Sequence, residues 1–374
     1  MWNNIIGQDK VKLFLKNSIK NKRLNSAYLF YGKKGVGKDA VAIELAKSLN
    51  CTNLNNNYDA CDNCKSCLDI QKFQSRYVKF ITALPASKQD NQDDNILLTL
   101  SSDDYEIYLS ELEKKSQNLY HRINLPKANS IRIDSIRQLI KEAYITASED
   151  KKKVFIISDC DLMNQNTANS ILKILEEPPH NTIIILTTSR INSLLPTITG
   201  RCQKIVFESL NKNDLQFYLK NHFAELDNRE LELFSEIAQG SLGIFQDFEL
   251  DSFNQFRQNI VDILRNLVSE KYIGMSKLIS EITELKDKNI AKLTLFILML
   301  WFKDVNQAKI KNYQNIINKD LTENIKTFAN KYDANIFRII LILEDTVRDI
   351  DSNVNLELLF HNLVYNIKSN LYNQ

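Results

Sequence analysis

The stretch Gly32-Lys33-Lys34-Gly35-Val36-Gly37-Lys38-Asp39 lies between an apolar run, 27–31, and an amphipathic segment, 40–49. A strand, a glycine-rich loop and a helix in this order form a phosphate-binding loop (P-loop). The glycines bring backbone N–H groups close to phosphate oxygens, and the helix N-terminus adds partial positive charge. The stretch therefore predicts a P-loop α/β domain with nucleotide contacts from Gly32, Gly35, Gly37 and Lys38.

One position of this loop departs from the usual pattern. A P-loop lysine is normally followed by Ser or Thr, whose hydroxyl binds Mg²⁺, whereas Asp39 follows Lys38 here. A carboxylate adds repulsion beside a triphosphate, and it does not reproduce the geometry of the neutral ligand, although it can bind a metal ion. We therefore expect the P-loop fold without normal ATP hydrolysis. An ATPase in which Asp39, or Asp159 further along the chain, holds Mg²⁺ in an unusual way is the open alternative.

The bulk composition is that of a globular protein with more than one domain. The chain has 374 residues, of which 44% are hydrophobic and 25% charged, with a formal net charge of +2. This balance argues against a strongly basic protein that coats nucleic acid, while local DNA contacts stay open. The longest apolar run, 293–302, is about half the length of a transmembrane helix, and residues 1–6 lack a signal-peptide arrangement. We expect a soluble, cytoplasmic protein with no membrane contact.

Four of the six cysteines crowd into a short segment with the spacing C-x9-C-x2-C-x2-C. Four thiolates at these separations can close a tetrahedral metal site, and an all-cysteine site is structural because it leaves no position for water or substrate. In a cytosolic chain such a cluster indicates metal binding rather than disulfides. The segment 51–67 therefore predicts a Zn²⁺ module whose ligands are Cys51, Cys61, Cys64 and Cys67.

Two further apolar runs predict strands that end near the P-loop. The first, 154–157, is followed by Ser158 and Asp159, at the place where P-loop NTPases carry an Asp for Mg²⁺ and often a Glu for the attacking water. In one register Ser158 takes the Asp position. In the other Asp159 takes it and a cysteine follows, so the catalytic pair is incomplete either way. The second run, 182–186, ends in Thr187, which is placed to sense a phosphate or a catalytic water.

The remaining sequence divides into a polar segment and a helical half. Residues 83–129 are predominantly polar, which favours a surface insertion and leaves a partner-docking arm as the alternative. After residue 208 the pattern is continuous amphipathic helix, with a second boundary near 250. The predicted parts are therefore 1–208, 209–250 and 251–374.

Five motifs follow one another along the chain: Ile5-Ile6-Gly7-Gln8, the P-loop, the four-cysteine segment, Leu175-Glu176-Glu177-Pro178-Pro179 and Gly200-Arg201-Cys202. Taken in this order, they resemble the AAA+ clamp-loader subunits of bacterial DNA polymerase III. The resemblance implies an AAA+ domain over 1–208 with the zinc module inserted, a small helical lid over 209–250, and a helical collar for oligomerisation over 251–374. It also implies γ/τ and δ subunits as partners, and the β sliding clamp and primed DNA as targets of the assembly.

Within that family, the γ/τ motors hydrolyse ATP and a δ′ subunit does not. The motors carry Ser or Thr after the P-loop lysine, an Asp-Glu pair after the second core strand, and an arginine in the lid. Here Asp39, Ser158-Asp159 and Gly243 stand at those places. The resemblance thus implies a δ′-type subunit, which allows ATP with Mg²⁺ as a ligand without hydrolysis. A catalytically active γ/τ-type ATPase is the first alternative, and another AAA+ adaptor such as a helicase loader is the second.

The family's arginine finger has a counterpart in Arg201, although Gly200 replaces the serine that usually precedes it. In a ring of subunits such an arginine reaches the ATP of the neighbour and stabilises charge in the transition state. The resemblance therefore implies a catalytic role in trans for Arg201.

Overall fold

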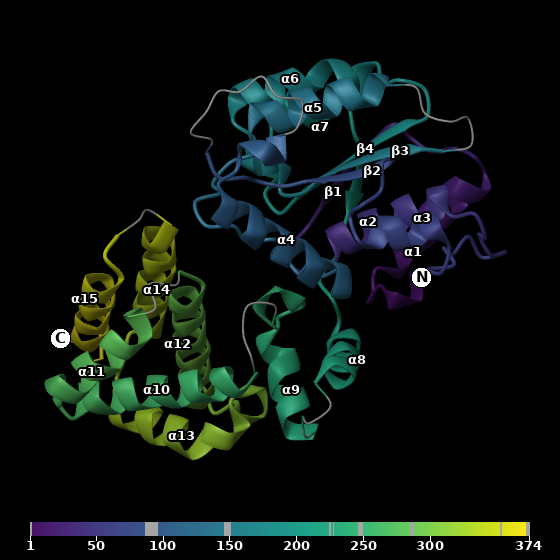
Figure 1. The fold of residues 1–374 in the computed structure, drawn as a ribbon. Coiled ribbons are helices and arrows are strands. Elements are labelled where there is room, and N and C mark those ends of the chain that lie inside the picture. The colour runs from purple at the N-terminus through teal and green to yellow at the C-terminus, as the bar shows by residue number, and fades with distance from the viewer. Residues whose placement is uncertain are drawn as a thin grey trace. The chain divides into compact units, whose positions relative to one another are not determined.

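The computed structural model describes residues 2–86, 96–145, 151–223, 226, 228–245, 250–284, 288–351 and 354–371. These residues form two compact units (Figure 1). Unit 1 comprises Met1–His222 and Gln239–Gln246, and unit 2 comprises Phe223–Ala238 and Asp247–Gln374. Part of the predicted polar insertion, residues 87–95, lies outside the described residues.

Unit 1 is built on a parallel sheet of five strands in the order β2-β3-β4-β1-β5. The strands are β1 (Ala27–Tyr31), β2 (Val78–Ile81), β3 (Lys153–Ile157), β4 (Thr182–Thr188) and β5 (Gln203–Val206). The predicted parallel α/β sheet is therefore confirmed. Since all the strands run the same way, the carboxyl ends of β1, β3 and β4 meet at one edge, where ligands bind in open α/β sheets.

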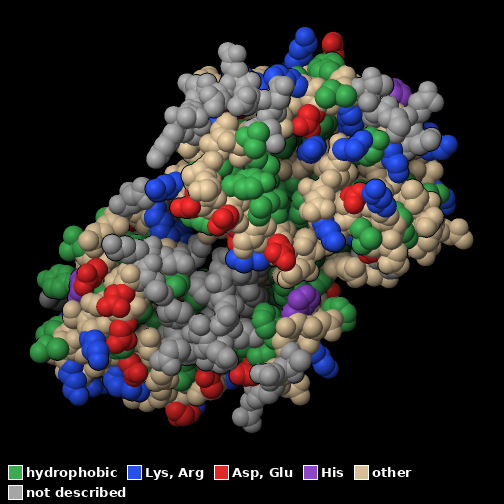
Figure 2. Space-filling model, viewed as in Figure 1, with side chains coloured by type: hydrophobic (Ala, Val, Ile, Leu, Met, Phe, Trp, Pro, Cys, Tyr) green, Lys and Arg blue, Asp and Glu red, His purple; other side chains and the backbone are tan. Residues whose placement is uncertain are grey.

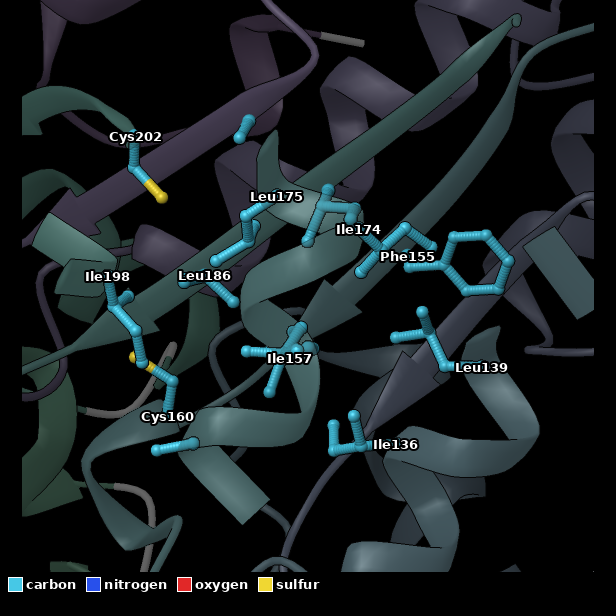
Figure 3. Close-up of a cluster of buried hydrophobic side chains, with 14 of the residues drawn as sticks. Ile136, Leu139, Phe155, Ile157, Cys160, Ile174, Leu175, Leu186, Ile198 and Cys202 are labelled. Atoms are coloured by element: carbon cyan, nitrogen blue, oxygen red, sulfur yellow. The ribbon is translucent and has the colours of Figure 1, made fainter. Parts of the chain in front are cut away.

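Helices cover both faces of this sheet (Figure 1). The helices α5 (Ile133–Tyr144), α6 (Gln165–Glu176) and α7 (Pro196–Thr199) lie on one face. Their apolar side chains pack with those of β3 and β4 in the main hydrophobic core (Figure 3). The opposite face carries α1 (Asp9–Lys20), α2 (Lys38–Asn50) and α3 (Lys65–Gln71).

Local sequence signals account for the ends of several helices. Asn164 caps α6, because its side chain accepts a hydrogen bond from the Thr167 N–H, and Pro178 follows shortly after its end. Ser101 caps α4 (Ser102–Gln117), the helix of the predicted insertion, in the same way. Unit 1 also contains α8 (Lys212–His222) and the short 3-10 helix Leu242–Phe245.

Unit 2 is helical, as predicted for the C-terminal half. It comprises α9 (Asn228–Ile237), α10 (Leu250–Val268), α11 (Tyr272–Thr283), α12 (Lys288–Lys309), α13 (Thr322–Lys331), α14 (Ile336–Asp351) and α15 (Leu356–Ser369). Helix α12 contacts α10, α13 and α14 and forms the centre of the unit. The span 209–250 contributes α8 and the segment 239–246 to unit 1, and α9 to unit 2.

The surface carries charges of both signs. Figure 2 shows Lys and Arg side chains interspersed with Asp and Glu over the visible face, in keeping with the net charge of +2. Within the described ranges, no helix has the length and apolar character to cross a bilayer.

Candidate functional site

The P-loop connects β1 to α2 at the carboxyl edge of the sheet. Gly37 has a φ of 95°, and an added Cβ would lie 2.9 Å from Cε1 of Tyr120. An added Cβ on Gly35 would lie 2.2 Å from the backbone N of Gly243. The loop glycines are therefore required both by backbone conformation and by the close approach of two other segments.

Lys38 turns back onto its own loop. Its Nζ donates hydrogen bonds to the carbonyl oxygens of Gly32, at 3.0 Å, and Lys33, at 2.6 Å. Burial lowers the pKa of Lys38, against the opposing effect of the Asp39 and Asp159 carboxylates. The cation that a P-loop offers to phosphate is thus held here by the loop's own carbonyls.

Both carboxylate oxygens of Asp39 are engaged by neighbouring side chains. Oδ1 accepts a hydrogen bond from Thr187 Oγ1 at 2.7 Å, and Oδ2 accepts one from Ser158 Oγ at 2.7 Å. Nζ of Lys115 lies 3.4 Å from the same Oδ2. Burial alone would raise the pKa of Asp39, but Lys115 and the two hydroxyls outweigh it and hold this pKa below its usual value. Asp39 is therefore an anchored carboxylate.

Asp159 follows β3 and points its carboxylate at another cation. It has a φ of 49°, and its Oδ2 lies 2.8 Å from NH2 and 3.0 Å from Nε of Arg122. Its backbone N donates to Thr187 Oγ1 at 3.3 Å. The structure thus brings the predicted residues Lys38, Asp39, Asp159 and Thr187 together at one edge of the sheet.

The arrangement does not fit a magnesium ion. Mg²⁺ requires oxygen ligands in near-octahedral geometry. The carboxylates of Asp39 and Asp159 are each already paired with a side-chain cation, Lys115 for Asp39 and Arg122 for Asp159. A divalent ion would have to displace both cations. In addition, the Asp39 carboxylate occupies the position from which the neutral hydroxyl of an ordinary P-loop binds Mg²⁺.

Sequence reasoning did not identify Lys115 and Arg122, which belong to the predicted insertion. A usable signal existed, because Lys115 lies seven residues after Tyr108, on the apolar side of the helix that the pattern predicts. Lys115 is buried in the structure, whereas the side chain of Arg122 is 49% exposed. A lysine on a buried helix face requires an anion or hydrogen-bond acceptors nearby, and Asp39 is one of them.

The four cysteines of the predicted zinc module converge. Their Sγ atoms all lie within 4.8 Å of one another, and those of Cys51 and Cys64 are 4.0 Å apart. Zn–S bonds of about 2.3 Å at tetrahedral angles place sulfur atoms about 3.8 Å apart. The backbone N–H groups of Asn53 and Cys61 donate to the Sγ of Cys51, and that of Cys64 to Sγ of Cys61. The set can hold a metal ion, and its chemistry fits zinc.

The thiols differ in how readily they ionise. Burial opposes ionisation of Cys64, but hydrogen bonds from Thr52 and Cys67 outweigh it and lower the pKa of Cys64 to about 5. Burial raises the pKa of Cys67 well above its ordinary value. The other two cysteines, Cys160 and Cys202, lie in the apolar core of unit 1 (Figure 3), where burial raises their pKa values.

Arg201 lies on the surface just after α7, with its side chain 35% exposed. Its NH1 donates to the carbonyl oxygen of Thr197 at 2.8 Å, and its guanidinium pairs with Glu176 at the end of α6. These contacts hold the guanidinium group itself between the ends of α6 and α7, at a position where the side chain is partly exposed.

The segment 241–243 lies against the P-loop. Ser241 Oγ donates to the carbonyl oxygen of Lys34 at 2.6 Å, and the Leu242 N–H donates to that of Gly35 at 3.0 Å. Gly243, where the motor subunits were expected to carry an arginine, thus lies beside the loop without a side chain.

The sequence model of the family described as "DNA polymerase III, delta subunit" matches residues 7–211, more than half of the chain. The chain belongs to this family. The resemblance seen in the motifs is thereby confirmed.

Relatives of the DNA polymerase III family match the chain to different extents. DNA polymerase III subunit delta' of Bacillus subtilis is 28% identical over 367 residues, which cover 96% of this chain and 95% of that protein. Subunit gamma of Buchnera aphidicola is 24% identical over 320 residues, covering 84% and 72%. Subunit tau of Escherichia coli is 25% identical over 244 residues, covering 64% of this chain and 31% of tau. The delta' relative is thus matched over almost its whole length.

Proposed function

We propose that the chain is a delta-prime-like subunit of the DNA polymerase III clamp loader that does not hydrolyse ATP itself. The observation that carries this proposal is the state of Asp39. This residue replaces the Mg²⁺-binding hydroxyl of a P-loop, and both of its oxygens are engaged by Thr187, Ser158 and Lys115. The similarity to a delta' subunit over nearly the full length of both chains supports the assignment.

The proposed contribution to catalysis is Arg201, delivered to the ATP of a neighbouring subunit. Glu176 and the Thr197 carbonyl hold the guanidinium at the surface, so the arginine is positioned without a nucleotide of its own. An arginine finger supplied in trans accelerates phosphoryl transfer by about 10³–10⁵. A subunit that has lost its own catalysis can therefore still be required for catalysis next door.

The remaining parts take supporting roles in this proposal. The AAA+ domain spans 1–208, with a structural Zn²⁺ stapling the 51–67 module. The lid spans 209–250, and the collar, 251–374, closes an assembly with gamma/tau and delta subunits. That assembly acts in the cytoplasm, where it loads the beta sliding clamp onto primed DNA during replication.

The test is ATP turnover by the reconstituted clamp loader that contains this chain. We expect Arg201→Ala to remove the part of the turnover that the neighbouring ATP site contributes. The complex should stay intact, as judged by size-exclusion chromatography. The matched control is Arg137→Ala, which removes an exposed arginine from an i,i+3 pair with Asp134 in α5 and should leave turnover unchanged. Turnover by the isolated chain that Lys38→Ala abolishes, together with a silent Arg201→Ala, would instead identify an active gamma/tau-type ATPase.

A further inference from the structure

The end of α4 and the turn after it, residues 115–122 (the insertion turn), supply two cations to the P-loop edge of the sheet. Lys115 Nζ lies 3.4 Å from Asp39 Oδ2, and Arg122 NH2 lies 2.8 Å from Asp159 Oδ2. These carboxylates stand after the P-loop lysine and after β3, the two places that hold Mg²⁺ in P-loop enzymes. At each of these two positions the carboxylate is thus paired with a side-chain cation, and both cations come from the insertion turn.

The ammonium group of Lys115 is buried and surrounded by acceptors. The side chain is 1% exposed, and its ammonium group has three N–H donors. Besides Asp39, its acceptors are the carbonyl oxygens of His121, at 2.7 Å, and Leu119, at 3.4 Å. The ring of Phe80 lies 5.0 Å from Nζ, within cation–π range. These partners hold the Lys115 side chain inside unit 1, where its charge is compensated.

The same turn also ties the P-loop to two other segments of unit 1. The Tyr120 ring lies against Gly37, and its hydroxyl accepts a hydrogen bond from the Ile6 N–H at 2.7 Å. Asn118 Nδ2 donates to the Tyr218 hydroxyl of α8 at 3.1 Å, and the rings of Tyr120 and Tyr218 meet edge to face at 5.9 Å. The P-loop, the N-terminal segment and α8 are therefore joined through one turn.

We propose that the insertion turn is an internal ligand of the P-loop, in which Lys115 and Arg122 replace the metal ion as counter-cations and Tyr120 with Asn118 holds α8 to the sheet. The site is then a permanent joint, formed without Mg²⁺ or nucleotide. This inference extends the non-hydrolysing function proposed above and rests on it. The tests below use the isolated chain, so they can fail while the trans role of Arg201 stands.

The first test asks whether the site takes a magnesium nucleotide. A ligand that binds the folded state raises the melting temperature once its concentration exceeds Kd. We expect MgADP and MgATP at about 1 mM to leave the melting temperature of the chain unchanged, as EDTA with ADP does. A Mg²⁺-dependent rise that Lys38→Ala abolishes would overturn the proposal.

The second test measures the coupling within the joint by a double-mutant cycle of Asp39→Asn and Lys115→Met. We expect each single variant to lower the folding equilibrium constant. The fold-reduction in the double variant should be at least ten times smaller than the product of the two single fold-reductions. Lys114→Met is the matched control, since Lys114 is the adjacent lysine, 58% exposed and paired with Glu111. Additive effects, with a coupling factor near one, would refute the joint.

The third measurement follows α8 directly. Hydrogen exchange of the backbone amides of Lys212–His222 should be faster in Lys115→Met and in Tyr120→Ala than in wild type, by at least tenfold, and unchanged in Lys114→Met. Tyr120→Phe keeps the ring against Gly37 and removes only the hydroxyl that accepts from Ile6, so it should retain most of the protection of α8. Protection of α8 that none of these variants alters would show that the turn does not hold it.

Discussion

Replacing Asp39 by serine would complete the P-loop consensus, yet we expect it to destabilise the chain. The substitution leaves the ammonium group of Lys115 without its carboxylate in a position where the side chain is 1% exposed. Removing one partner of a buried ion pair costs about 3–5 kcal/mol. Asp39 is itself 20% exposed at its side chain, and Lys115 keeps two carbonyl acceptors. Both facts place the expected loss at the lower end, about 3 kcal/mol.

The assay is urea unfolding followed in unit 1. The chain has two tryptophans. Trp2 is buried in unit 1 and Trp301 belongs to α12 in unit 2, so a Trp301→Phe background leaves Trp2 fluorescence as the reporter of unit 1. With a denaturant slope of about 3 kcal/mol/M, a loss of about 3 kcal/mol shifts the unfolding midpoint by about 1 M urea.

The control for this substitution is Asp9→Ser, which removes a carboxylate that is 92% exposed and pairs with Lys12 on the first turns of α1. Exposed ion pairs contribute about 0–1 kcal/mol, so this midpoint should hardly move. An Asp39→Ser variant that unfolds at the wild-type midpoint and binds MgADP would refute the reasoning, because Asp39 and Lys115 would then be independent of each other.

Three further predictions concern the metal, acid stability and unit 2. Purified protein should contain one zinc per chain by mass spectrometry, and Cys64→Ser should lose it and lower the melting temperature; a metal-free wild type of equal stability would exclude the zinc module. Although burial opposes it, the partners of Asp39 lower its pKa in the folded state. Its stabilisation should therefore be complete above about pH 4 and lost as pH falls through the lower folded pKa. Urea midpoints against pH should fall less steeply for Asp39→Asn. Asp304→Ala should destabilise unit 2 by about 3 kcal/mol, measured by Trp301 fluorescence, because Asp304 accepts three hydrogen bonds, from the Ile317 N–H and from the backbone and side-chain nitrogens of Asn318; Asp304→Asn, which keeps an acceptor, should lose less.

The architecture of unit 1 could be predicted from the sequence because its signals are local. The run 27–31 followed by spaced glycines and an amphipathic segment is a strand, a P-loop and a helix, and the structure has β1 and α2 at those places. The runs at 154–157 and 182–186 became β3 and β4 because apolar segments of that length suit strands buried on both faces of a parallel sheet. The four cysteines could be grouped because all of them lie within one short segment.

The electrostatics of the site could not be predicted in the same way, since its pairs are distant in sequence. Lys115 and Asp39 are 76 residues apart, and Arg122 and Asp159 are 37 apart, and no periodicity links such positions. The register after β3 was also ambiguous. The structure explains why, because Ser158 directs its hydroxyl to Asp39, while the positive φ of Asp159 turns that carboxylate toward Arg122. The two residues serve different partners, and neither stands in for an Asp-Glu pair.

The charges of the site show why Asp39 and Lys115 depend on each other. A carboxylate introduced beside the P-loop would repel phosphate and would be costly to bury alone, and a lysine buried alone on the inner side of α4 would be equally costly. Together they form an ion pair supported by the Thr187 and Ser158 hydroxyls on one side and by two backbone carbonyls on the other. In the joint proposed above, this pair satisfies the buried charges of the site without a bound ligand. Arg201 is held instead by Glu176 and Thr197 and contacts none of these groups, so the role in trans proposed for it does not depend on the pair at the P-loop.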